Sequence, residues 1–224
     1  GESVGASLYQ KIEDFLFEKE NQVGYAHYSS GWLQAFRKNL LNPDEERPFS
    51  AEDWDLGLSI KQNKHKVIYE PQAISQKYAA LSIEDLFNQR IRAIIGGIQV
   101  LVKNKNLLNP LKWGIFSLIF FSNKPIQIMS PFLIMVIFFS SLSIYFLTSN
   151  VIFYYLVSLQ ILVFFIGFIT ITTSSIKEID IQPFPTIKFF TLMQVICLIA
   201  WVDYFRGNYG TTWETIKSSR IVKK

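Results

Sequence analysis

Three short groups of residues in the first half of the chain have side chains suited to acid–base chemistry or anion binding. The first combines a serine, a glycine and a tryptophan, the second pairs two carboxylates, and the third places two arginines beside a glutamine. In chain order the groups are Ser30, Gly31 and Trp32; Glu52 and Asp53; and Gln89, Arg90 and Arg92. Their order along the chain carries more information than any one group.

Asp53 is the candidate general base. The run Ser50–Asp53 has the form of a capping box and predicts that a helix begins there. Backbone N–H groups and the helix dipole stabilise the charged form of a carboxylate at such a position. If it faces a cleft, Asp53 can accept a proton from an attacking hydroxyl. The alternative is that Asp53 only completes the capping box.

The third group suits the binding of a diphosphate. Gln89 and Arg92 are three residues apart and therefore share a face of a predicted helix, with Arg90 beside them. Guanidinium groups bind phosphates through forked, charge-assisted hydrogen bonds. The alternative is a solvated helix face. The following Gly96 and Gly97 either let the backbone approach a neighbour closely or loosen the helix.

The elements that position these groups are predicted from apolar spacing. Helical periodicity runs from Leu8 to Val23, follows Asp53 as far as Ile60, and returns between Ser82 and Leu101. The first of these helices carries acidic residues that we interpret as its solvated face, namely Glu13, Asp14 and Glu18. A short β-branched and aromatic run, Val67–Tyr69, is closed by Glu70-Pro71 and predicts a strand.

The second half of the chain has a different composition. Residues 1–105 hold 13 basic and 14 acidic residues, whereas the remainder holds 9 and 4 and is rich in Ile, Leu, Phe and Val. A hydrocarbon core of about 30 Å needs about 20 helical residues. We therefore predict a domain over residues 1–105, an interfacial helix within 106–124, and a membrane part over 125–224. The expected spanning helices are 131–147, 151–171 and 184–205, and a basic tail follows them.

The remaining composition narrows the class of protein. The surplus of positive charge flanks apolar stretches, which favours contact with a membrane surface over binding to nucleic acid. Cys197 is the one cysteine in the sequence, so neither a disulfide framework nor a thiolate metal site is expected. His27 and His65 are interpreted as packing or surface residues. Both ends of the membrane part are basic, so the number of crossings stays open.

The order of these features resembles that of the membrane-bound, processive-type family-2 glycosyltransferases, such as the chitin, hyaluronan and cellulose synthases. The resemblance covers nearly the whole chain, from about Leu8 to its end. It rests on the Ser30-Gly31-Trp32 group, the Glu52-Asp53 pair, and Gln89-Arg90-Ile91-Arg92, followed by several apolar helices. Trp213 and Arg220 are similar to a tryptophan-then-arginine tail of many members.

The resemblance implies a fold, an activity and a set of roles. The fold would be α/β plus membrane helices: the acceptor-side part of a GT-A-type domain, then an interfacial helix and a bundle of about three transmembrane helices. The activity would be inverting transfer of a sugar from a nucleotide-sugar donor to a polysaccharide or glycolipid acceptor at the plasma membrane, with the catalytic part cytoplasmic. Asp53, with Glu52 beside it, would be the catalytic base. Gln89, Arg90 and Arg92 would bind the donor diphosphate, and Ser30, Gly31 and Trp32 would bind the acceptor.

Two departures from the family pattern limit these expectations. Ala93 stands where the family has the tryptophan of its Q-x-x-R-W motif, so a stacking platform for the acceptor sugar is missing or lies elsewhere. This leaves open non-processive glycosylation of a lipid carrier. No Asp-x-Asp motif precedes Asp53, so the ligands of the divalent metal (Mg or Mn) used by the intact enzyme are expected outside this chain. We therefore expect the chain to be a fragment that is inactive alone. A non-catalytic membrane transport or scaffold component is the alternative from another class.

Overall fold

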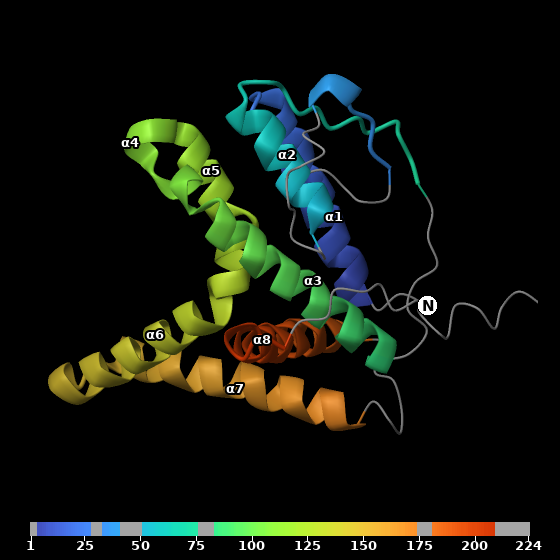
Figure 1. The fold of residues 1–224 in the computed structure, drawn as a ribbon. Helices are drawn as coiled ribbons and strands as arrows, with labels where there is room; N and C mark the ends of the chain where they lie inside the picture. Colours follow the sequence, from blue (N-terminus) through green and yellow to red (C-terminus); the bar gives the residue numbers. More distant parts are fainter. Residues whose placement is uncertain (1–3, 28–32, 41–50, 76–82, 174–180, 209–224) are drawn as a thin grey trace, which may run out of the picture. The chain divides into compact units, whose positions relative to one another are not determined.

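The computed structural model describes residues 4–27, 33–40, 51–75, 83–173 and 181–208, and these residues are helical over most of their length (Figure 1). They form two compact units. The core unit comprises Ile12–Ile128 and Ile199–Lys224, and the membrane-helix unit comprises Gly1–Lys11 and Met129–Leu198. The elements are α1 (Val4–Gln22), η1 (Lys38–Leu40), α2 (Glu52–Gln62), α3 (Ile83–Lys103), η2 (Lys105–Leu108), α4 (Pro110–Trp113), α5 (Ile115–Ser122), α6 (Lys124–Thr148), α7 (Val151–Thr173) and α8 (Phe184–Phe205).

The predicted strand at Val67–Tyr69 is wrong, and no β-strand occurs in the part of the chain that the structure describes. The Asn21 side-chain amide makes the two backbone hydrogen bonds that a neighbouring strand would otherwise make. Asn21 Nδ2 donates to the carbonyl of Tyr69 at 3.0 Å, and the Tyr69 N–H donates to Asn21 Oδ1 at 3.1 Å. Because both backbone polar groups of Tyr69 are satisfied in this way, the extended segment needs no partner strand.

The core unit is built where α2 packs against α3. Trp54 and Leu58 of α2 and Ile95 and Ile98 of α3 are buried in one apolar cluster, to which α5 adds Phe120. The apolar stripe predicted for α3 is confirmed at its carboxyl-terminal end, where Ile95, Ile98 and Leu101 are buried. These residues recur at helical spacing, so one face of α3 supplies much of the core.

Among the residues that the structure describes, three helices are long and apolar enough to cross a membrane, namely α6, α7 and α8. Within the most apolar stretch of each helix, 11, 6 and 39% of the residues are buried inside the protein, so most of this apolar surface is left for lipid. Apolar helices of spanning length thus occur at all three predicted places, and they indicate an integral membrane protein. The first begins earlier than predicted, at Lys124, because the helix continues through Pro131 where a start was expected.

The predicted interfacial segment is divided into short helices. Gly114 has φ +58° and ends α4, and α5 begins at the next residue. A left-handed φ is accessible to glycine at little cost, which explains why the break falls there. On α5, Phe116 and Phe120 face the core, whereas Leu118 and Phe121 are exposed. The placement of this segment at a membrane surface stays a prediction.

Candidate functional site

Glu52 and Asp53 lie in the first turn of α2. Glu52 is exposed and Asp53 is half-buried. One carboxylate oxygen of Asp53 accepts a hydrogen bond from the backbone N–H of Trp54 at 2.9 Å. The first N–H groups of a helix have no partner within it, so this contact satisfies one of them.

The helix does not begin with the predicted capping box. Its N-cap is Ala51, whose φ of −145° lies outside the helical range and whose side chain makes no capping hydrogen bond. The Ala51 carbonyl accepts the N–H of Asp55 at 3.0 Å, which is the first turn of the helix. Asp53 therefore occupies the second helical position instead of the third, and Ser50 lies outside the described residues.

A close approach of side chains from α2 and α6 explains the glycine at position 97. A Cβ built on Gly97 would lie 3.7 Å from the Trp54 ring and 2.9 Å from Cδ1 of Ile128. Because Trp54 follows Asp53 directly, this contact brings the amino-terminal turn of α2 beside the middle of α3. The interpretation of Gly97 as a site of close approach is therefore confirmed.

A buried polar group fixes α2 against the carboxyl-terminal end of α3. Asp55 is only 1% exposed. Its two carboxylate oxygens accept hydrogen bonds from Lys103 Nζ at 2.7 Å and from Asn104 Nδ2 at 2.9 Å. The Asn104 side-chain carbonyl in turn accepts from Gln62 Nε2 at 2.6 Å. Contacts of this kind are directional, so they set the register of the two helices more sharply than apolar packing does.

The candidate diphosphate-binding residues lie on α3, where Gln89, Arg90 and Arg92 are all half-buried. With a rise of about 1.5 Å per residue, Arg92 and Gln89 lie about 7.5 and 12 Å along the axis from Gly97. The structure thus places the carboxylate pair and the Gln-Arg-x-Arg run on two packed helices of one unit. Ala93 is exposed on α3. The predicted acceptor group, Ser30, Gly31 and Trp32, lies outside the described residues.

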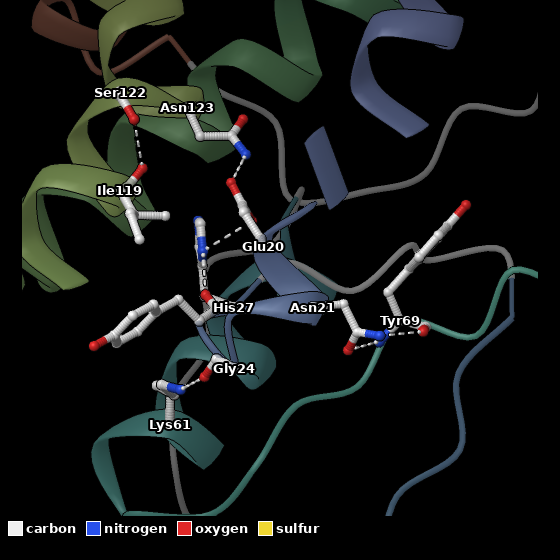
Figure 2. Close-up of polar contacts among 10 residues, drawn as sticks. Glu20, Asn21, Gly24, His27, Lys61, Tyr69, Ile119, Ser122 and Asn123 are labelled. Carbon is white, nitrogen blue, oxygen red and sulfur yellow. Dashed lines mark hydrogen bonds and ion pairs between the residues drawn. The ribbon is translucent and has the colours of Figure 1, made fainter. Parts of the chain in front are cut away.

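A second polar cluster joins the end of α1 to the start of α6, and Figure 2 shows how its side chains converge. Glu20 Oε1 accepts from Asn123 Nδ2 at 2.7 Å, and Glu20 Oε2 lies 3.4 Å from His27 Nδ1. The same His27 nitrogen lies 3.3 Å from the carbonyl of Tyr25. The ring of His27 packs edge-on against Phe116 and Phe120, with centroids 5.7 and 5.5 Å apart.

Burial controls the protonation of this cluster. Desolvation raises the pKa of Glu20 to about 7, although the Asn123 hydrogen bond and the charge of Lys124 lower it. Desolvation also lowers the pKa of His27 to about 4, and the charges of Lys61 and Lys124 act in the same direction. Between these values both side chains are neutral, so the contact between them is not an ion pair. Glu20 Oε2 is buried without a hydrogen-bond partner.

Sequence reasoning missed the acidic members of this cluster. Glu13 was interpreted as part of the solvated face of its helix, but it is 8% exposed and forms an ion pair with Lys124. The spacing of Glu13, Phe17 and Glu20 was an available signal, because residues four and seven apart share one helix face and all three are buried. The partners Asn123 and Lys124 are about 100 residues away, so no local pattern reveals them. His27 is a packing residue, as predicted, and His65 is exposed.

The membrane-helix unit contains an apolar groove among α6, α7 and α8, with a cavity volume of about 540 Å³. Its walls are mostly aliphatic and aromatic, and they include Phe138, Phe164 and Leu198. Two amides, Gln160 and Gln194, are its polar groups, and Gln194 Oε1 accepts a hydrogen bond from Ser130. The size lies within the range of about 300–1,000 Å³ that is usual for small-molecule pockets.

The described residues do not assemble a set of metal ligands. In these parts of the chain, His, Cys, Asp and Glu side chains do not gather in groups of three or more that could hold an ion.

Comparison with known proteins identifies the family. The model of the family described as "Glycosyl transferase family group 2" matches residues 22–170, which is more than half of the chain and includes both the Glu52-Asp53 pair and the run from Gln89 to Arg92. The chain belongs to glycosyl transferase family group 2. No curated protein and no solved structure matches it. The predicted membership of family 2 is thus confirmed, whereas the processive, synthase-like subtype stays a prediction. This membership together with the three apolar helices supports a membrane-bound glycosyltransferase.

Proposed function

We propose that this chain is part of an enzyme that transfers a hexose from a nucleotide-sugar donor, with inversion, to a saccharide or lipid-linked acceptor at the plasma membrane, from its cytoplasmic side. The observation that carries the proposal is the family match across residues 22–170, which spans both groups of candidate catalytic residues. The packing of α2 on α3 through Trp54 and Gly97 supports it, because the two groups then belong to one unit.

In the proposed reaction an acceptor hydroxyl attacks the anomeric carbon of the donor sugar. A new carbon–oxygen bond forms to the acceptor while the bond to the diphosphate breaks. Asp53 takes the hydroxyl proton, and Glu52 adds negative charge beside it. Gln89, Arg90 and Arg92 stabilise the charge that develops on the departing diphosphate. The acceptor would contact Ser30, Gly31 and Trp32.

We further propose that the intact enzyme uses a divalent metal, Mg or Mn, held by residues outside this chain. Such an ion would neutralise charge on the diphosphate of the bound donor. The long side chains of Arg90 and Arg92 would approach the same diphosphate from α3.

A second candidate acceptor, a lipid carrier that receives one sugar, is favoured by two observations. Ala93 is exposed on α3 and offers no ring on which a growing saccharide could stack. The groove among α6, α7 and α8 is lined mainly by apolar side chains, which suits a hydrocarbon chain better than a polar polysaccharide. Product analysis separates the two candidates: a single sugar on a lipid supports the carrier, and a long saccharide supports processive synthesis.

The test of the catalytic role is the substitution Asp53→Asn in the intact protein. Membranes are supplied with a panel of UDP- and GDP-sugars, and the released nucleotide is measured. We expect Asp53→Asn to lower kcat by about 10²–10⁴-fold, because general-base catalysis contributes about that factor. Asp14→Asn, which changes an exposed carboxylate on α1, serves as the matched control and should leave kcat unchanged.

The outcomes discriminate among the readings of Asp53. Unchanged turnover in a folded, inserted Asp53→Asn protein would show that the carboxylate only caps the first turn of α2. Absence of turnover with every donor, in the unaltered protein, would favour a non-catalytic membrane component.

A further inference from the structure

The cluster at the end of α1 holds a buried pair that the proposed reaction does not use. His27 is 0% exposed and Glu20 is 8% exposed. The His27 Nε2 atom is buried without a hydrogen-bond partner, so the state of its ring is decided at Nδ1. Two acceptors face Nδ1, the Glu20 carboxylate at 3.4 Å and the Tyr25 carbonyl at 3.3 Å.

The charge of Glu20 determines which bonds His27 can make. When Glu20 is charged it can only accept, and the His27 Nδ1–H donates to the Tyr25 carbonyl. Glu20 Oε2 then lies 3.4 Å from Nδ1 without a hydrogen-bond partner. When Glu20 is protonated, its O–H can donate to Nδ1, which must then carry a lone pair and place its hydrogen on Nε2. In this second state Nδ1 no longer donates to Tyr25. The Nδ1 lone pair and the Tyr25 carbonyl oxygen, which are both acceptors, then face each other.

The segment that holds the Tyr25 carbonyl also contacts α2. The Gly24 carbonyl accepts a hydrogen bond from Lys61 Nζ at 2.7 Å, and the same ammonium lies 5.5 Å from the Tyr25 ring. A second path runs through aromatic rings, because the Phe120 ring that touches His27 lies 6.0 Å from Trp54. Both paths end on the helix that begins with Glu52 and Asp53.

We propose that Glu20 and His27 form a proton-dependent latch on the segment Gly24–His27, and that they act as positioning residues for α2. With Glu20 charged, the latch is closed through the Nδ1–H bond to Tyr25. With Glu20 protonated, a proton passes from Nδ1 to Nε2 of His27 through solvent, and the bond to Tyr25 is lost. The effect on catalysis rests on the proposed function, whereas the latch itself does not.

Charged groups from α1, α2 and α6 act on this latch. Lys124 at the start of α6 and Lys61 on α2 both face the pair, and Glu13 on α1 balances Lys124. Asn123 holds the Glu20 oxygen that does not face His27. The pKa of Glu20, raised to about 7, places the transition close to neutral pH.

The latch is tested by nitrogen-15 NMR of the full chain in lipid nanodiscs. The sequence has only two histidines, so a His65→Gln background leaves His27 as the one imidazole. We expect His27 to stay neutral from pH 5.5 to 8.5, and its Nδ1 signal to change from the bare to the protonated type with a midpoint near pH 7. A ring that becomes cationic near pH 6.5, or a tautomer that does not change with pH, would overturn the latch.

Two variants provide the controls. Glu20→Gln should abolish the tautomer change, while Glu18→Gln, at an exposed position two residues earlier on α1, should leave its midpoint unchanged. If Glu20→Gln does not fold, the spectra of the His65→Gln protein still decide the question.

The positioning role is tested on the intact protein by the pH dependence of turnover. We expect kcat to change several-fold with a midpoint near pH 7, this step to disappear in Glu20→Gln, and KM for the donor to stay the same. A kcat profile that Glu20→Gln does not alter would overturn the positioning role even if the tautomer changes. Absence of turnover with every donor would contradict the proposed function and its positioning clause, and the nitrogen signals would then decide the latch alone.

Discussion

Two buried carboxylates in the core unit are held in opposite ways. Asp55 is 1% exposed and lies between the ammonium of Lys103 and the amide of Asn104. Glu20 is 8% exposed, and its nearest partners are the neutral amide of Asn123 and the neutral ring of His27. Both sit where two helical elements meet, but only Asp55 is in direct contact with a cation.

The difference shows that the partner decides what burial does to a carboxylate. A carboxylate transferred from water loses its hydration, and an adjacent cation with well-directed hydrogen bonds offsets that loss. Asp55 has such a cation, so it serves as a fixed joint between α2 and α3. Glu20 lacks one at bonding distance, and its pKa is raised to about 7, so its charge depends on pH near neutrality.

The largest expected effect comes from removing the cation beside Asp55. We expect Lys103→Met to lower the free energy of unfolding by about 3 kcal/mol, since breaking a buried pair costs about 3–5 kcal/mol and the Lys103 side chain is about one-third exposed. Denaturation of the protein in detergent micelles measures the loss. Lys105→Met, at an exposed position two residues later, is the control and should change little.

A second substitution sharpens this result. Adding Asp55→Asn to Lys103→Met should restore much of the lost stability, because no unpaired charge then remains buried. Equal stability of Lys103→Met and Lys105→Met would mean that the two carboxylates do not differ as described.

The next effect is a pH dependence of the free energy of unfolding, to which Glu20 and His27 contribute with opposite signs. The raised pKa of Glu20 lowers stability as pH rises from 4.5 to about 7, whereas the lowered pKa of His27 lowers stability as pH falls from 6.5 to about 4. Between pH 4.5 and 6.5 the two trends oppose each other. We therefore expect the stability of the wild-type protein to vary little over this window.

Each single variant should expose one trend. In Glu20→Gln, stability should rise with pH between about 4 and 6.5, and in His27→Gln it should fall as pH rises from 4.5 to 7. The limiting slope is about 1.4 kcal/mol per pH unit for one proton, and the whole change is on the order of 3 kcal/mol. Chemical denaturation at half-unit steps of pH measures it. Parallel profiles for the two variants would show that the pair does not titrate as described.

The smallest effect is expected at Asn123. The hydrogen bond from its amide lowers the pKa of Glu20, so Asn123→Leu should move the high-pH end of the Glu20 transition above pH 7. Loss of this bond should also cost about 1–2 kcal/mol of stability. The shift is measured from the pH profile in a His27→Gln background, where Glu20 titrates alone. An unmoved transition would assign the bond no role in setting the charge of Glu20.

Much of the helical architecture could be predicted from local pattern. The apolar windows that became α6, α7 and α8 are long and apolar enough to span hydrocarbon, which needs about 20 helical residues. The helices carrying Asp53 and Gln89 were likewise predicted by their apolar spacing. The capping box was not formed as predicted: the N-cap is Ala51, whose side chain makes no capping hydrogen bond.

The predicted strand failed because a short β-branched run defines no partner. Val67–Tyr69 favours an extended backbone, but whether that backbone pairs with another strand depends on what lies beside it. Here Asn21, 48 residues earlier, supplies both hydrogen bonds to Tyr69. Strand propensity mainly measures how well a side chain packs on the pleated surface of a sheet. It therefore says little about an extended segment whose hydrogen bonds come from a side chain.

The sequence by itself predicted the family through its resemblance to family-2 glycosyltransferases, and it predicted the apolar helices through composition and length. The roles of Asp53, Gln89 and Arg92 stay predictions. Only the tertiary structure revealed that Asp55 meets Lys103, that Glu13 and Glu20 are buried, and that His27 lies between Glu20 and Tyr25. Those pairings join residues up to 111 positions apart. Desolvation and hydrogen bonding act on what is near in space, so the protonation of Glu20 is set by the fold and not by the residues that flank it.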